Sequence, residues 1–334
     1  MSIFKLRILA FFSSLLMSTF VAAESPSWPA KPIQVVVPYA AGGTLDAIVR
    51  ILAVDMSKDL KQSIVVVNSP GAGGSIGVRR VRHSTPDGYT VLAGTISDVV
   101  LASLSDTSAG YSSADLTAVG AIGQNGVAII GRGDLPAEDM ASLLALAKSA
   151  PRALTYGSSG APGSFQHLAM ESIKSRAQID MPFVPYKGAA QVTADLLGGH
   201  LDLGVLGLPS LLPHIASGKL KVYAVVSAKR DPIAPSIPSV SETAGLESVN
   251  FSFWNGLFVP NGTPAAIVNR LHQSLVSTLQ KTTVVDALRR SGVDVTVSSS
   301  PAEFSAYVKA QEQSFATMLR DRGLGASQPA ASKR

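Results

Sequence analysis

The sequence contains no cysteine. Disulfide bonds, thiolate zinc sites and cysteine nucleophiles are therefore excluded, and so is a lipid anchor attached to a cysteine. Charged residues are also scarce, at 15% of the 334 residues, whereas hydrophobic residues make up 46%. This balance excludes a disordered chain. The formal charge of +5 is too small and too dispersed to predict nucleic-acid binding.

Patterns typical of metal and cofactor sites are also missing. The five histidines are scattered, and no H-E-x-x-H run or pair of loop carboxylates is present. The P-loop pattern is absent as well. Residues 71–77 form a glycine-rich turn, but the next expected strand ends in Gly94 and Thr95, where an NAD site requires an acidic residue. We therefore expect no metal, no cofactor and no acid–base catalysis.

Long hydrophobic runs are absent beyond the N-terminus. Lys5 and Arg7 precede an apolar stretch at 8–21, which is too short to span a bilayer, and Ala22 and Ala23 follow as small residues. This order is typical of a cleaved signal peptide, here residues 1–23. It predicts a protein exported to the periplasm, with an uncleaved anchor as the alternative.

The rest of the chain is organised around residues 33–46. An apolar, β-branched run at 33–37 predicts a buried strand, which Pro38 ends. Small residues follow at 40–43, and Thr44 is placed to cap a helix with apolar residues at helical spacing. A bare loop that leads into a helix N-terminus suits an anion, because backbone N–H groups point out of it. A tight turn closed by Asp46 explains the same residues, so both interpretations stay open here.

Strands and helices alternate along the chain, which predicts parallel α/β architecture with ligands at the carboxyl ends of the strands. Because so many strands are unusual for one sheet, we expect two α/β lobes with a cleft between them. The strands are expected at 33–37, 64–67, 90–93, 119–123, 127–130, 154–157, 183–185, 201–206, 220–226, 249–254, 257–259 and 293–297. The helices are expected at 44–60, 75–82, 136–150, 165–176, 189–197, 209–217, 264–280, 283–291 and 301–322.

A serine hydrolase is the strongest enzyme hypothesis. Ser158 and Ser159 lie at a strand-to-helix turn, and His167 follows nearby. However, the surrounding residues do not match the G-x-S-x-G elbow of such enzymes. The serines also fit a simpler role, because their hydroxyls suit a bound anion or the cap of the next helix. Loops of Gly, Ala, Ser and Thr at helix N-termini favour carboxylate binding over catalysis.

Ten short motifs, in order along the chain, carry a family resemblance that extends over about residues 28–323. Each is weak alone, but together they are specific. They lie at 28–33, 37–46, 68–74, 85–90, 156–160, 184–188, 195–199, 208–210, 217–220 and 256–260. With these motifs the chain resembles the extracytoplasmic solute receptors of tripartite tricarboxylate transporters, called TctC or Bug proteins.

The resemblance implies a type II periplasmic-binding-protein fold, in which two crossing segments join two α/β lobes around a ligand cleft. It implies lobe I at 24–126 and 250–326 and lobe II at 127–249. The polar residues at the C-terminus separately predict a disordered tail at 327–334. A small carboxylate is the implied ligand, gripped by one loop from each lobe and contacted by two further loops. The implied ligand-binding residues are Tyr39, Ala40, Ala41, Gly42, Gly43, Thr44, Asp46, Ser97, Ser158, Ser159, Gly163, Ser164, Gly207 and Leu208.

This sequence departs from the family pattern in ways that bear on the ligand. Ala41 stands where proline often precedes the two glycines, and residues 96–100 are more apolar than is usual after the third strand. Residues 204–207 hold Gly-Val-Leu-Gly, where many relatives have Asp or Asn. We therefore expect a ligand with one carboxylate and a hydrophobic or aromatic body, and not citrate. Lys187 is either a second charge contact or an ordinary surface lysine.

The main hypothesis is a monomeric receptor that delivers its ligand to the membrane subunits of a transporter. A sensor subunit that signals to a membrane kinase is one alternative, and a hydrolase that uses Ser159 and His167 is another. The family grips the carboxylate with backbone amides. We expect the amides of residues 41–44 to do so here, while Asp46 holds the loop through its N–H groups.

Overall fold

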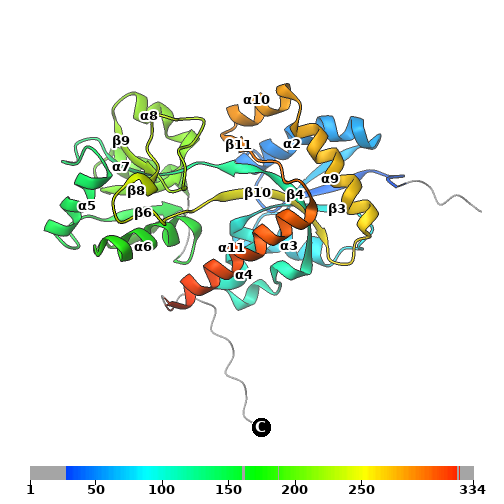
Figure 1. Ribbon diagram of the computed structural model, residues 1–334, viewed down its shortest axis with the longest axis horizontal. Helices are drawn as coiled ribbons and strands as arrows, with labels where there is room; N and C mark the ends of the chain where they lie inside the picture. The colour runs from blue at the N-terminus through cyan, green and yellow to red at the C-terminus, as the bar shows by residue number, and fades with distance from the viewer. Residues whose placement is uncertain (1–27, 160–161, 187, 322, 324–334) are drawn as a thin grey trace, which may run out of the picture.

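Two β-sheets form the frame of the protein, and extended segments of the chain connect them (Figure 1). The computed structural model describes residues 28–159, 162–186, 188–321 and 323. The signal peptide predicted at 1–23 and the tail predicted at 327–334 lie outside the described residues, as does Lys187. Among the helices described, none is long and apolar enough to cross a membrane.

The six-stranded sheet is the centre of lobe I. Its strand order is β11-β4-β10-β3-β1-β2. The strands are β1 (Ile33–Val37), β2 (Ile64–Asn68), β3 (Thr90–Thr95), β4 (Leu116–Asn125), β10 (Phe253–Pro260) and β11 (Val293–Val295). The helices around it are α2 (Thr44–Leu60), α3 (Ser75–Arg82), α4 (Ala102–Ser105), α9 (Ala265–Leu279), α10 (Thr282–Arg290) and α11 (Pro301–Asp321).

The five-stranded sheet is the centre of lobe II, with strand order β7-β6-β8-β5-β9. Its strands are β5 (Val127–Arg132), β6 (Tyr156–Ser159), β7 (Phe183–Tyr186), β8 (Leu203–Gly207) and β9 (Leu220–Val225). The helices of this lobe are α5 (Met140–Ser149), α6 (Phe165–Ala177), α7 (Ala189–Leu197) and α8 (Leu212–Ala216). Gly126 alone separates β4 of lobe I from β5 of lobe II.

The short helices complete the element order. They are η1 (Ala72–Gly74), the π-helix η2 (Ile96–Leu101), η3 (Thr107–Ala109), η4 (Ser113–Asp115), η5 (Leu208–Ser210) and η6 (Val240–Glu242). Of these, η2 and η5 follow directly after strands β3 and β8, so they lie at the carboxyl ends of strands in the two lobes.

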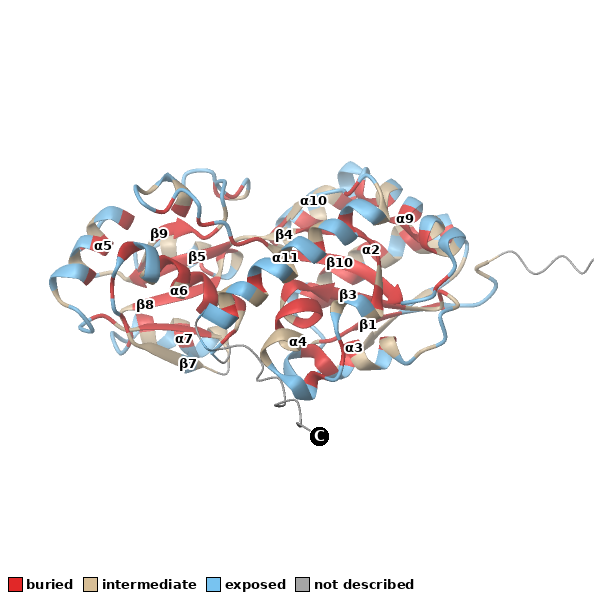
Figure 2. Ribbon diagram, turned by 60° about the horizontal axis from the view of Figure 1, so that its bottom comes forward, coloured by how far each residue is buried: buried red, intermediate tan, exposed pale blue. Residues whose placement is uncertain are grey.

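Burial follows the strands of both sheets (Figure 2). Four of the five residues of β1 are buried, as expected for a strand covered by helices on both faces. At the base of the cleft between the lobes, Phe165 of α6 makes edge-to-face contacts with Phe251 and Phe253, at ring distances of 5.7 and 5.1 Å. Phe315 of α11 packs on Phe165 and Phe251, so one aromatic cluster joins the two lobes.

The structure corrects the prediction of purely parallel sheets. In lobe I, β10 runs antiparallel to both β3 and β4, and β11 runs antiparallel to β4. In lobe II, β5 is antiparallel to β8 and β9. The reason is the exchange between the lobes, because β4 leads into β5 and a long segment returns from β9 to β10. The hydrophobic pattern of a strand does not indicate the direction of the strands beside it.

Two local predictions were also wrong. The strands predicted at 249–254 and 257–259 are one strand, β10. Residues 96–105 were not expected to be helical, but they form η2 and α4. The signal was present, because Thr95 and Asp98 make a capping box, which is a helix-start pattern.

Candidate functional site

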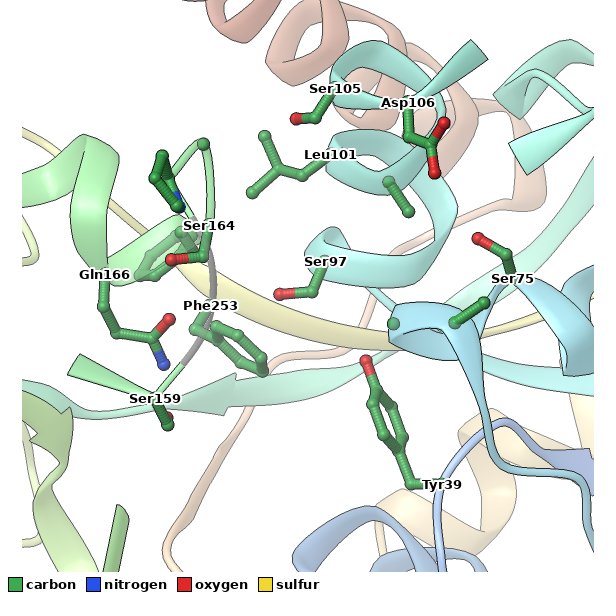
Figure 3. A pocket seen from close by; sticks show the side chains of 16 residues that line it. Tyr39, Ser75, Ser97, Leu101, Ser105, Asp106, Ser159, Ser164, Gln166 and Phe253 are labelled. Atoms are coloured by element: carbon green, nitrogen blue, oxygen red, sulfur yellow. The ribbon is translucent and has the colours of Figure 1, made fainter. Parts of the chain in front are cut away.

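A cleft lies between the lobes and contains two adjacent chambers. The first chamber, about 640 Å³, lies between the N-terminus of α2 and the ends of β6 and β8. The second chamber, about 470 Å³, lies between η2 and α4 on one side and the start of α6 on the other (Figure 3). Tyr39, Ser159, Gln166 and Phe253 line both chambers. Their position between the lobes is where a two-lobed protein encloses a ligand.

The N-terminus of α2 opens into the first chamber. Gly43, Thr44 and Leu45 line this chamber, and the first helical hydrogen bond runs from the amide of Ala47 to the carbonyl of Gly43. The amides of the first turn therefore have no acceptor within the helix. The N-cap is Gly43, not Thr44 as predicted, and for this described residue no side chain caps the helix. The result is a set of N–H donors at the positive end of a helix dipole, which suits an anion.

Asp46 holds the β1–α2 loop in this shape. Its Oδ2 accepts from the amide of Gly42 at 2.9 Å and from Nε of Arg50 at 2.9 Å, and its Oδ1 accepts from Nδ2 of Asn68 at 3.0 Å. Asn68 also donates to the carbonyl of Tyr39 at 3.1 Å. The hydrogen bonds from Arg50 hold the pKa of Asp46 at about 2. A buried, ionised carboxylate thus ties the loop to α2 and to the end of β2.

This arrangement refines the expectation for the loop amides. The amide of Gly42 donates to Asp46, so it is not directed at a ligand in this structure. The expectation that Asp46 binds the loop and not the anion agrees with these contacts. The donors that remain are those of the first turn of α2, from Gly43 onward.

A buried polar network forms the floor between the chambers. The hydroxyl of Tyr39 donates to Oδ2 of Asp98 at 2.8 Å and lies 3.2 Å from Oγ1 of Thr95. The same carboxylate accepts from the amide and the hydroxyl of Thr95, at 3.0 and 2.7 Å. Burial raises the pKa of Asp98 to about 6 and the pKa of Tyr39 well above its ordinary value. The network fixes the Tyr39 ring in the cleft and starts η2, from which Ser97 lines the second chamber.

Lobe II contributes the end of β6 and the start of α6. Ser159 lines both chambers, whereas the neighbouring Ser158 is fully buried. Ser164 is the N-cap of α6, and Gly163 before it has a φ of +91°. The amide of Gly163 donates to Nδ1 of His167 at 3.1 Å, which fixes the loop against its own helix.

The position of His167 argues against a serine hydrolase. A backbone N–H is only a donor, so Nδ1 of His167 accepts, and the ring proton is on Nε2. That Nε2 faces Glu171, at 4.0 Å from Oε1. The lone pair that a general base needs is therefore engaged by Gly163. In the part of the chain that the structure describes, no group of three or more His, Cys, Asp or Glu is placed to hold a metal ion.

The structure brings most of the predicted residues to the cleft. Those that line the chambers are Tyr39, Gly43, Thr44, Ser97, Ser159, Gly163, Ser164 and Gly207. Those outside the chamber walls are Ala40, Ala41, Gly42, Asp46, Ser158 and Leu208. Leu208 and Ser158 are fully buried, and Leu208 packs into the hydrophobic core of lobe II.

Sequence reasoning missed several residues that line the chambers. They include Gln166, Phe253, Asn125, Asn255, Leu101, Ser105 and Asp106. Phe253 and Asn255 lie on β10, which was not expected to face a ligand. Leu101, Ser105 and Asp106 follow the helix start at Thr95, so recognising that capping box would have directed attention to them.

Comparison with known proteins agrees with this architecture. The sequence profile of the tripartite tricarboxylate transporter family receptor, TctC, matches residues 48–324. BugT of Bordetella pertussis is 31% identical over 321 residues, which are 95% of this chain and 98% of that protein.

Two solved structures are similar over most of the chain. The periplasmic binding protein BugD has a TM-score of 0.75 and 31% identity, over 90% of this chain and all of that one. Rpa4515 of R. palustris, solved with adipate, has a TM-score of 0.77 and 31% identity, over 90% of this chain and 99% of that one. The fold is thus the two-lobed type II fold of periplasmic binding proteins. The chain belongs to the tripartite tricarboxylate transporter receptor family, TctC.

Proposed function

We propose that the protein is a periplasmic receptor that captures a small organic carboxylate and delivers it to the membrane subunits of a tripartite tricarboxylate-type transporter. The observation that carries the proposal is the N-terminus of α2, whose first-turn amides open into a chamber between the lobes. Among the described residues of that chamber wall, none is a Lys, Arg or His. Neutral donors and a helix dipole bind a carboxylate without the desolvation cost of a buried cation.

Closure of the lobes is the proposed working motion. We assign residues 24–126 and 250–326 to lobe I and residues 127–249 to lobe II, and we expect the protein to act as a monomer. Support comes from Gly126, the single residue between β4 and β5, and from the return segment before β10. A ligand that contacts both lobes favours the closed state, because it gains contacts there that the open state lacks.

A thermal-shift screen of small mono- and dicarboxylates tests the receptor function. A ligand at 100 times its Kd adds about 2.7 kcal/mol of stability, which is a measurable rise in melting temperature. The apolar part of the chamber walls, which includes Phe253, Pro209 and Val127, supports a ligand with one carboxylate and an apolar body. Benzoate-type acids should therefore raise the melting temperature more than citrate does. Tight binding of citrate alone would contradict this ligand class.

Replacement of Ser159 separates the receptor from the hydrolase alternative. In Ser159→Ala, a receptor loses a hydroxyl that lines both chambers, so ligand affinity should fall several-fold. A hydrolase would lose its turnover of ester substrates and keep its affinity. Ser149→Ala, on the exposed end of α5, is the matched control and should change neither property.

A sensor subunit for a membrane kinase is the second candidate, and it shares the same closure on a ligand. The transport receptor and the sensor differ in which membrane protein binds the closed, ligand-loaded form. Uptake of the bound carboxylate by cells that carry the membrane subunits should require this protein if it serves transport. Normal uptake in cells without the protein would favour sensing.

A further inference from the structure

The second chamber differs from the first in its chemistry. Serine hydroxyls from both lobes line it: Ser75, Ser97 and Ser105 from lobe I, and Ser159 and Ser164 from lobe II (Figure 3). Among the described residues of its wall, none is a Lys, Arg or His, and Asp106 is the one acidic residue. This wall offers hydrogen bonds to a ligand but offers no positive charge for a second carboxylate.

Two of these hydroxyls lack a protein partner. The Oγ atoms of Ser105 and Ser164 are buried and form no hydrogen bond with any described residue. They come from opposite lobes, and the lobes meet beside them: a Cβ placed on Gly163 would lie 3.1 Å from Oγ of Ser105. Both Oγ atoms are shielded from solvent, so a ligand group reaches them only when a side-chain rotation turns them toward the chamber. A hydrogen bond made there supplies a missing partner and gains more than the same bond at an exposed site.

Asp106, which is an exposed residue, adds a negative charge to the wall of the same chamber. Its Oδ1 accepts from the amide of Ser108 and its Oδ2 from the Ser108 hydroxyl, both at 2.7 Å. These bonds lower the pKa of Asp106, so the side chain is ionised at neutral pH. A carboxylate has room for about four hydrogen bonds and accepts only, which leaves sites for a donor on a ligand. A second ligand carboxylate would meet a like charge here.

We propose that the second chamber receives the far end of the carboxylate ligand and selects a hydroxyl there over a second carboxylate. The ligand then lies across both chambers, with its carboxylate at the N-terminus of α2 and its apolar body along Phe253, which lines both. Its hydroxyl donates toward Asp106 and pairs with the hydroxyls of Ser97, Ser105 and Ser164. The ligand class is therefore a hydroxylated monocarboxylate. This inference rests on the proposed receptor function.

Matched pairs of ligands test the selection at the far end. Isothermal titration at pH 7.5 would compare 6-hydroxyhexanoate with adipate, and 4-hydroxybenzoate with terephthalate. In each pair the skeleton is the same and only the far group differs. The hydroxy acid should bind at least about tenfold more tightly in the pair whose skeleton fits. A dicarboxylate that binds as well as its hydroxy acid overturns the inference and leaves the receptor function intact. Failure of all four to bind overturns the inference, and the receptor function is overturned only if the thermal-shift screen also finds no carboxylate that stabilises the protein.

Removal of the charge at Asp106 gives a second test with a matched control. Asp106→Asn keeps an oxygen that accepts from the Ser108 amide, so the turn is preserved, but the negative charge is lost. The affinity for the dicarboxylate of the fitting pair should rise about threefold or more, while that for its hydroxy acid should not rise. Asp134→Asn removes an equal charge from an exposed residue outside both chambers and should change neither affinity. Equal effects of the two variants on the dicarboxylate would contradict the role of Asp106.

Discussion

Asp46 gives the sharpest test of how the carboxylate site is built. The variant Asp46→Asn keeps the size of the side chain and an oxygen that accepts from the amide of Gly42. It removes the charge that pairs with Arg50, whose Nε and Nη2 lie 2.9 and 3.0 Å from the two carboxylate oxygens. The variant also replaces Oδ1, which accepts from Asn68, with an amide group that cannot accept. The loop is then held less firmly to β2, so both stability and ligand affinity should fall.

The magnitude follows from the pKa of Asp46. The pKa falls from 3.8 to about 2, which corresponds to at most about 2.4 kcal/mol of stabilisation. The Arg50 side chain is 53% exposed, so solvent screening lowers the expected value to about 1–2 kcal/mol. Because the native pKa lies below the unfolded value, this stabilisation is complete above about pH 5 and is lost as the pH falls toward 2. About half of it should remain at pH 3.

Urea unfolding followed by tryptophan fluorescence measures this difference. Asp46→Asn should lower the free energy of unfolding by about 1–2 kcal/mol at pH 7, and the gap to the wild type should shrink by about half at pH 3. Asp55→Asn on the same helix is the control. Asp55 pairs at 3.4 and 3.1 Å with Lys58 and Lys281, both well exposed, so its loss should be smaller. An equal gap at both pH values would refute the linkage argument.

Two further predictions concern the cleft. Burial raises the pKa of Asp98 to about 6, so the native state binds this proton more tightly than the unfolded chain, and the wild type should gain stability relative to Asp98→Asn as the pH falls from 7 to 5. Urea unfolding checks this, and a gap that does not change with pH would contradict it. Gly163→Ala places a Cβ at a φ of +91° and 3.1 Å from Oγ of Ser105, so calorimetry should show about tenfold weaker carboxylate binding. Gly245→Ala has a similar φ of +83° in open space, so it should cost stability and leave affinity unchanged.

The order of the elements could be predicted from the sequence, because hydrophobic periodicity and turn residues are local signals. The predicted helix at 75–82 matches α3, and the predicted strand at 33–37 matches β1. The sheet directions could not be predicted, because they depend on where β4 and β10 pass between the lobes. The hydrophobic pattern of a strand is the same whether the neighbouring strand is parallel or antiparallel.

The two chambers also differ in how far they could be predicted from the sequence. The anion-binding part of the first chamber is formed by one contiguous stretch of sequence: a strand, a loop of small residues and a helix N-terminus. The groups that would bind the anion are backbone amides of that stretch. The second chamber combines Ser75, the adjacent pair Ser105 and Asp106, and Ser164. The first three belong to lobe I and Ser164 to lobe II, so separate parts of the chain meet only in the folded protein. No spacing rule connects them, so the sequence suggested an anion site but not what lies beyond it.

The backbone and the side chains of the cleft contribute differently to ligand recognition. Backbone amides at a helix N-terminus bind one carboxylate much like another, since they contact only the group that all these ligands share. Selection among carboxylates must then come from the side chains around the rest of the ligand. In this chain those side chains are the aromatic ring of Phe253, the serine hydroxyls and the charge of Asp106. Variation of these residues, with the β1–α2 loop unchanged, should alter which carboxylate binds without removing carboxylate binding itself.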